Sequence, residues 1–340
     1  MATAMAETVP LTVLTGFLGA GKTTLLNRLV RRPDMAGTAV LVNEFGEIGL
    51  DHILVDKITD TTVLLPSGCL CCAVQGDLVR ALRDLLPRVH AREISRVVVE
   101  TTGLADPAPI VQSLLGDVSV ALRFRLDGIV TVVDAVHALG QLDRQEEAVR
   151  QVAMADRIVL SKTDLPHDDA ALRARLRALN PMAPVLTADH GVVDPGAILD
   201  CGLFDATGKI GDVRRWLDAA AFAGVPVTPG PAPGRHDGAI QSFCLTFTEP
   251  LHWQGVGTCL EMLIGTRGES LLRVKGILNL VGQTRPVAIH GVQHMFHEPV
   301  LLDGWPEGDP RTSRIVFITR GLDRDTIESG LKAFEAAASA

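Results

Sequence analysis

The chain has 340 residues, a formal net charge of -8 at pH 7, 47% hydrophobic residues and 21% charged residues. This length allows two domains with their own cores, and the acidic charge argues against a nucleic-acid partner because phosphate backbones select basic surfaces. No apolar run approaches the roughly 18 residues of a membrane helix, and the N-terminus lacks a signal-peptide pattern, so we expect a cytoplasmic protein with no membrane partner.

The first apolar run, residues 11–15, leads directly into a glycine-rich stretch. Residues 16–24 read GFLGAGKTT and match the phosphate-binding pattern G-x-x-x-x-G-K-[ST] at every fixed position. In that pattern, backbone N–H groups at a helix N-terminus surround phosphate, the lysine reaches the β- and γ-phosphates, and the hydroxyl binds Mg²⁺. We therefore predict that Lys22 contacts the phosphates, that Thr23 binds Mg²⁺, and that the nucleotide-binding residues here are Gly16, Gly19, Ala20, Gly21, Lys22, Thr23 and Thr24.

Apolar strands alternate with helices after this stretch. Helices are predicted over residues 22–32 and 76–86, each ended by a proline, because leucines recur there at helical spacing. Strands are predicted over residues 39–42, 61–65, 96–100, 129–134 and 157–161. This alternation is typical of an α/β fold with a mostly parallel, doubly wound sheet, in which the ligand binds beyond the carboxyl ends of the strands. The direction of strand 61–65 is left open.

Three cysteines lie in one turn after strand 61–65, at Cys69, Cys71 and Cys72. Thiolates at these spacings bind Zn²⁺ and similar ions, and a closed structural zinc site would need a second cysteine pair, which the chain lacks. We therefore predict an open, exchangeable site, completed by Glu44 or Glu47 or by an exogenous ligand. How many of the cysteines bind is left open, and a buried or redox-active cysteine cluster is the alternative. The scattered cysteines are expected to pack in cores: Cys201, Cys244 and Cys259.

Residues 100–103, Glu-Thr-Thr-Gly, follow another predicted strand. Glu100 is placed to lie near Mg²⁺ and the N–H of Gly103 near the γ-phosphate, with Lys22 as the third catalytic residue. The alternative for Glu100 is a carboxylate that caps a helix. No arginine finger or water-orienting glutamine is evident in these loops, so we expect slow intrinsic hydrolysis that a metal or a partner stimulates.

A second nucleotide motif follows strand 157–161. Residues 161–164, Ser-Lys-Thr-Asp, resemble the guanine-reading Asn-Lys-x-Asp of GTPases, in which the aspartate accepts hydrogen bonds from guanine and the lysine lies along the base. Ser161, Lys162 and Asp164 are therefore predicted to bind GTP. The shorter Ser161 leaves the strictness of the choice of GTP over ATP open.

The composition changes at residues 222–236, which hold four prolines and three glycines. This composition is typical of a linker. We predict a nucleotide-binding domain at 1–221 and a smaller α+β domain at 237–340. In the latter, strands are predicted at 240–247, 271–280, 286–294 and 314–319, and helices at 253–264 and 323–338. If His290 and His294 share a strand face they would lie roughly 13 Å apart, too far to share an ion, so satisfied or surface histidines, with His297, are expected.

Taken in order, these motifs resemble those of the CobW family of GTP-dependent metallochaperones and zinc-associated GTPases, relatives of the GTPases that deliver nickel to urease and hydrogenase. The resemblance rests on residues 16–24, 43–47, 68–72, 100–107 and 161–164, and on 272–277 and 314–319 in the second domain. Many members carry a histidine-rich stretch before the second domain, whereas only His236 lies near the linker here. This departure argues against metal storage.

The resemblance implies that GTP with Mg²⁺ orders the Glu44 and Cys69 loops into a site for Zn²⁺ or Co²⁺, and that hydrolysis releases the metal to a client protein. A homo-oligomer is possible. One alternative is a zinc-responsive regulatory protein in which GTP turnover is incidental. A P-loop kinase is a more distant alternative, since it would leave Asp164 and the cysteine turn without a role.

Overall fold

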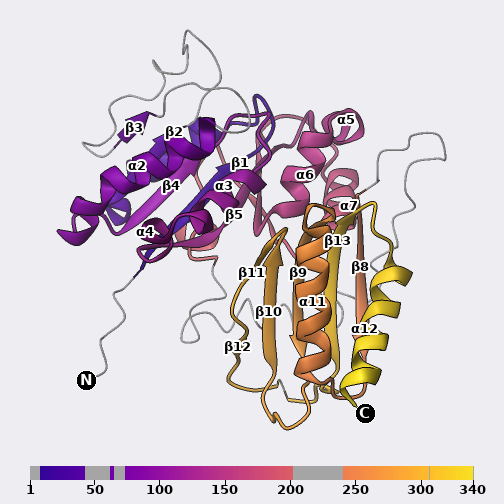
Figure 1. Cartoon of the computed structure of the whole chain (residues 1–340). Helices are drawn as coiled ribbons and strands as arrows, with labels where there is room; N and C mark the ends of the chain where they lie inside the picture. The colour runs from indigo at the N-terminus through magenta and orange to yellow at the C-terminus, as the bar shows by residue number, and fades with distance from the viewer. Residues whose placement is uncertain (1–7, 43–61, 65–72, 202–239, 306, 340) are drawn as a thin grey trace. The chain divides into compact units, whose positions relative to one another are not determined.

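The computed structural model describes residues 8–42, 62–64, 73–201, 240–305 and 307–339 (Figure 1). Contacts between residues divide the chain into two compact units, Met1–Arg173 with Ala183–Gly202 and Ala174–Met182 with Leu203–Ala340. The linker predicted at residues 222–236 lies outside the described residues. Among the described helices, none has the length and apolar character needed to cross a membrane.

The first unit is built on a parallel sheet of seven strands, in the order β3-β2-β4-β1-β5-β6-β7. Every neighbouring pair runs parallel, which confirms the predicted α/β class. It also settles the direction of the strand before the cysteine turn, because β3 pairs in parallel with β2. The strands are β1 (Val9–Thr15), β2 (Thr38–Val42), β3 (Thr62–Leu64), β4 (Arg96–Glu100), β5 (Phe124–Asp134), β6 (Arg157–Ser161) and β7 (Val185–Thr187).

Helices alternate with these strands along the chain. They are α1 (Lys22–Val30), α2 (Ala73–His90), α3 (Ala108–Gly116), α4 (Val118–Ala121), α5 (Ala138–Arg144), α6 (Glu146–Met154), α7 (Asp169–Leu179) and α8 (Pro195–Ile198), with a 3₁₀ turn η1 (Pro33–Met35) after α1. In α1, the apolar spacing places Leu25, Leu26 and Leu29 in the core. The helix ends at Val30, two residues before the predicted end.

The end predicted for α2 at residue 86 is wrong, because the helix continues through Pro87 to His90. Proline lacks an N–H and removes one helical hydrogen bond. Leu82 and Leu85 are buried on the preceding turns, and the turn beyond the proline is closed by the N–H of Ala91, which donates to the Pro87 carbonyl at 3.0 Å. The buried leucines before Pro87 and the hydrogen bond after it together keep the last turn helical.

The second unit holds a mainly antiparallel sheet in the order β11-β10-β9-β13-β8, with β12 paired to β10. Helices α11 (Trp253–Arg267) and α12 (Arg324–Ala338) lie side by side against one face of this sheet (Figure 1), where Phe243 and Phe317 stack at 5.6 Å in the core. The predicted α+β class is confirmed. The strands are β8 (Ile240–Phe247), β9 (Leu271–Leu278), β10 (Val287–Val292), β11 (Met295–Phe296), β12 (Val300–Leu301) and β13 (Ser313–Arg320), and a 3₁₀ turn η3 (Gly268–Ser270) precedes β9.

The histidines of this unit do not share a strand. His290 and His294 do not lie on one strand, because β10 ends at Val292 and the backbone turns at Gln293, which has a φ of 50°. Instead, the ring of His290 lies 4.8 Å from that of His297 and accepts a hydrogen bond from Arg273 at Nε2 over 2.9 Å. His290 is therefore a buried histidine that is hydrogen-bonded at Nε2.

The scattered cysteines have the environment that was expected of them. Cys201 and Cys259 are buried within the two cores, and Cys244 is half-buried. Burial raises the pKa of Cys259 to about 11 and also raises that of Cys244. These two thiols therefore carry little thiolate at neutral pH, which is the form that binds metals.

Candidate functional site

The glycine-rich stretch forms a tight loop between β1 and α1. Gly16 has a φ of 143°, and a Cβ atom placed on it would lie 2.2 Å from the carbonyl oxygen of Val132 in β5. Gly21 has a φ of 89° and is the N-cap of α1. The backbone can take this course only without side chains at these two positions, and it brings the loop to the helix N-terminus, where anions are stabilised.

Lys22, the first residue of α1, folds back over this loop. Its ammonium group donates to the carbonyl oxygens of Gly16 at 2.9 Å and Phe17 at 3.3 Å, and the residue is buried. A buried cation held over the concave side of a phosphate loop is placed to compensate the charge of a bound phosphate. The loop and the lysine therefore fit the phosphates of a nucleoside triphosphate.

The next residue, Thr23, lies beside the end of β4. Its hydroxyl donates to Oε1 of Glu100 at 2.6 Å, and Glu100 is 4% exposed. A hydroxyl and a carboxylate are hard oxygen ligands of the kind that Mg²⁺ takes together with phosphate oxygens, so this pair fits a magnesium ion. The capping alternative for Glu100 is not supported, because α3 begins only at Ala108, whose N–H donates to Asp106.

The loop after β4 lies directly against the phosphate loop. A Cβ atom on Gly103 would lie 2.6 Å from the backbone nitrogen of Leu18, so only glycine allows this approach. Upstream, the N–H of Thr101 donates to the carbonyl of Leu14 at 3.0 Å. The structure therefore brings Lys22, Thr23, Glu100 and Gly103, the predicted catalytic and magnesium residues, to one edge of the sheet.

The residues predicted to read guanine, Ser161, Lys162 and Asp164, follow β6 at the same edge. The hydroxyl of Ser161 donates to the carbonyl of Ala20 in the phosphate loop at 2.6 Å, a contact that ties the two motifs together. Lys162 has a φ of 56° and donates to Oδ2 of Asp134 at 2.7 Å. Asp164 is the third predicted residue, and its Oδ2 lies 3.9 Å from Nδ1 of His190.

Comparison with known proteins agrees with this geometry. Residues 10–187 match the family described as CobW/HypB/UreG, nucleotide-binding domain, and residues 240–335 match the cobalamin synthesis protein cobW C-terminal domain. The chain belongs to the CobW family. It is 35% identical to the zinc chaperone YjiA of Escherichia coli over an alignment of 326 residues. The alignment covers 94% of this chain and 97% of that protein.

Two further CobW relatives extend this similarity. The zinc-regulated GTPase metalloprotein activator 1 of Saccharomyces cerevisiae is 28% identical over 366 residues, covering 95% of this chain and 83% of that protein. The crystal structure of Zn(II)-bound YjiA GTPase from E. coli superposes with a TM-score of 0.70 at 30% identity, covering 96% of this chain and 99% of that one. The likeness to these CobW proteins therefore extends over both domains.

Asp134 ends β5 at the same edge of the sheet, and its contacts there were not predicted from the sequence. It accepts hydrogen bonds from the N–H groups of Val136 and His137, from Nδ1 of His137 and from Lys162. Burial opposes the charged form, but the bonds from Lys162 and His137 outweigh it, and the pKa of Asp134 is lowered. A charged Asp134 thus holds Lys162, the lysine predicted to lie along the base in this CobW protein.

The predicted transition-metal ligands lie outside the described residues: Glu44, Glu47, Cys69, Cys71 and Cys72. The strands that precede them, β2 and β3, end at the same sheet edge as β1 and β4. Among the described residues, no group of three or more His, Cys, Asp and Glu side chains is placed to hold a metal ion.

Proposed function

We propose that this protein is a GTP-hydrolysing metallochaperone. It binds Zn²⁺ or Co²⁺ through Cys69, Cys71 and Cys72 together with Glu44 or Glu47, and it delivers the metal to a client protein. The observation that carries the GTPase part is the hydrogen bond between Thr23 and Glu100 beside the buried Lys22. The metal part is supported by the similarity to a zinc chaperone and to a zinc-regulated GTPase metalloprotein activator.

In this proposal, the chain's own groups perform the hydrolysis by positioning and by charge. Lys22 offsets negative charge on the β- and γ-phosphates, and the N–H of Gly103 donates to the γ-phosphate. Thr23 and Glu100 hold Mg²⁺, which supplies further positive charge to the phosphate oxygens. Because the sequence of these loops shows no glutamine that would orient the attacking water, we expect a low intrinsic rate.

Guanine is selected by Asp164, whose carboxylate accepts from the two N–H donors at one edge of that base. Adenine lacks this pair of donors, so ATP would leave the carboxylate unsatisfied. Lys162, held by Asp134 at 2.7 Å, keeps its carbon chain along the base. Ser161 serves the phosphate loop through its bond to Ala20.

Coupling between nucleotide and metal follows from the shared edge of the sheet. GTP orders the loops that carry Glu44 and Cys69, and the loss of the γ-phosphate releases them and the metal. Linkage requires that the metal tighten GTP binding by the same factor as GTP tightens metal binding. This reciprocity gives the proposal two independent measurements of one quantity.

The experiment is a competitive titration of Zn²⁺ and Co²⁺ with Mg²⁺ present and either a non-hydrolysable GTP analogue or GDP. We expect the GTP-analogue state to bind the metal at least 10-fold more tightly, a coupling of ordinary size. Cys71→Ser should abolish the difference between the two nucleotides. Cys244→Ser, at a thiol whose pKa is raised by burial, is the matched control and should retain it.

An affinity that ignores the nucleotide would overturn the chaperone proposal. The chain would then be a zinc-responsive regulatory protein that also turns over GTP. A difference that survives Cys71→Ser would move the metal site away from the cysteine turn while leaving nucleotide gating in place.

A further inference from the structure

Gln151 in α6 is a buried polar residue that the proposed mechanism does not use. It is 1% exposed, and its Nε2 donates to the carbonyl oxygens of Gly103 at 3.2 Å and Ala105 at 3.0 Å. An amide NH₂ group has two donors, and both are directed at the loop after β4. The opposite orientation of the amide would set Oε1 against two carbonyl oxygens, so the bonding pattern fixes which atom faces the loop.

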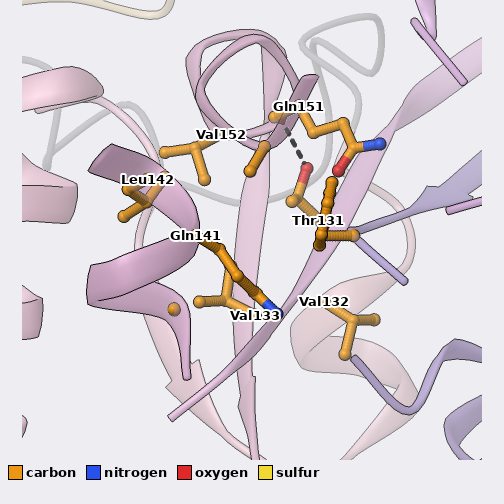
Figure 2. Close-up of a pocket in the computed structure, with 10 residues that line it drawn as sticks. Thr131, Val132, Val133, Gln141, Leu142, Gln151 and Val152 are labelled. Atoms are coloured by element: carbon orange, nitrogen blue, oxygen red, sulfur yellow. Dashed lines mark hydrogen bonds between the residues drawn. The ribbon is translucent and has the colours of Figure 1, made fainter. Parts of the chain in front are cut away.

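The backbone of Gln151 is itself fixed to the sheet. The hydroxyl of Thr131, a buried residue of β5, donates to the Gln151 carbonyl at 2.8 Å (Figure 2). Both residues line a small pocket, partly open to solvent, that is also lined by Phe17 of the phosphate loop. Gln151 therefore bridges the central sheet and the loop after β4.

A second contact from α6 reaches the same loop one residue further on. Nη1 of Arg150 lies 3.3 Å from Oδ2 of Asp106, and the other carboxylate oxygen of Asp106 accepts from the N–H of Ala108. Residues 103, 105 and 106 are thus all held by two consecutive residues of one helix.

These bonds fix both peptide groups that flank the Cα atom of Gly103. The carbonyl of Thr102 accepts from the N–H of Ala105 at 3.1 Å. In a trans peptide the N–H points in the opposite direction to the C=O, so the Gly103 N–H points away from this turn. The carbonyl of Gly103 is held by Gln151. The direction of the N–H that is proposed to meet the γ-phosphate is therefore set before nucleotide binds.

We propose that Gln151 is a positioning residue that holds the loop after β4 so that the N–H of Gly103 is ready for the third phosphate of a nucleoside triphosphate. The inference rests on the proposed GTPase function. In the proposed function only the γ-phosphate meets Gly103, so we expect the clamp to stabilise the GTP complex and to leave the GDP complex unchanged. Preorganisation of this kind removes the entropy of ordering the loop from the cost of binding.

The test compares the affinities of the full-length protein for GDP and for a non-hydrolysable GTP analogue, both with Mg²⁺, together with kcat for GTP. Gln151→Met keeps the approximate volume and removes both donors. We expect about 10-fold weaker binding of the analogue and a similar fall in kcat, with GDP affinity within about 2-fold, as the loss of two ordinary hydrogen bonds implies.

Two other substitutions at α6 separate the donors from the fold. Gln151→Glu preserves the shape but presents an acceptor to two carbonyl oxygens, and it should lose at least as much analogue affinity as Gln151→Met. Arg150→Met removes the partly exposed contact to Asp106 together with the surface pair to Glu146 within α6, and it should show the same GTP-specific loss at about 2-fold to 3-fold. It keeps the test valid if the buried variants fold poorly.

Gln141→Met is the matched control, because Gln141 in α5 lines the same pocket, whereas the amide that bonds the carbonyls of this loop is that of Gln151. It should bind both nucleotides as the parent does. Equal losses for GDP and the analogue, or no loss for either, would overturn the clamp while the parent still binds and hydrolyses GTP. If the parent itself binds neither nucleotide, the proposed function fails first and the clamp fails with it.

Discussion

The hydroxyl of Thr23 and the carboxylate of Glu100 meet at 2.6 Å, although 77 residues separate them in the chain. Parallel pairing of β1 with β4, in which Leu14 lies opposite Glu100, brings the end of one strand beside the loop that follows the other. The pair joins the two motifs that would share a magnesium ion, and it defines the first prediction.

Glu100→Gln should raise the Mg²⁺ concentration needed for GTP hydrolysis by about 10-fold or more and lower kcat. The amide oxygen can still accept from Thr23, so the fold is retained, but the charge that binds the ion is lost. Hydrolysis measured over a range of Mg²⁺ concentrations checks this. GDP binding without Mg²⁺ serves as the control, and a variant with an unchanged Mg²⁺ requirement would remove Glu100 from the ion site.

Gly16→Ala should abolish nucleotide binding and lower the thermal midpoint markedly. The new methyl group would meet the Val132 carbonyl at 2.2 Å, a contact that neither backbone can relieve without moving. Gly282→Ala is the comparison, since Gly282 also has a positive φ of 79° but nothing lies within 4 Å of its Cβ position. It should cost only the backbone strain, about 1–2 kcal/mol. Equal effects would mean that strain rather than the steric contact decides.

Asp164→Asn should weaken GTP binding by about 100-fold and improve the binding of xanthosine triphosphate. Xanthine carries a carbonyl where guanine carries an amino group, so the amide of asparagine can donate to it. Competition between the two nucleotides measures the exchange. A variant that loses both alike would indicate that Asp164 supports the loop instead of reading the base.

Because of Asp134, we expect the free energy of unfolding to depend on pH in the acidic range. Its pKa in the folded protein is lowered, so its contribution is present above the unfolded pKa of about 3.9 and is lost as the pH falls below that value. Asp134→Asn should therefore destabilise the protein at pH 6 by about 1–3 kcal/mol, and the difference from the parent should shrink towards pH 3. Denaturant titrations at several pH values check this, and a constant difference would mean that the charge of Asp134 is not the cause.

Much of the first domain can be predicted from local patterns. The glycine spacing of residues 16–24 predicts the loop because each glycine answers a backbone requirement, such as the φ of 89° at Gly21. The apolar run at residues 157–161 predicts β6 with the same bounds. Local patterns did not predict that α2 continues through Pro87, because buried leucines on the preceding turns decide whether the helix continues.

The parts of the site that were missed are contacts between distant segments. Nothing in the sequence around Gln151 marks it as a partner of Gly103, 48 residues earlier. Asp134 stands at the end of an apolar run, as several other residues do, and only the neighbouring position of β6 gives it Lys162. The order of the strands is the information that local patterns lack.

The bond from Ser161 to Ala20 makes the base-reading end and the phosphate end of the site parts of one rigid frame. A nucleotide seated by its base therefore meets the phosphate loop in a constant register, whatever the length of its phosphate chain. If the proposed function holds, nucleoside mono-, di- and triphosphates would differ only in how far their phosphate chains extend beyond this fixed contact.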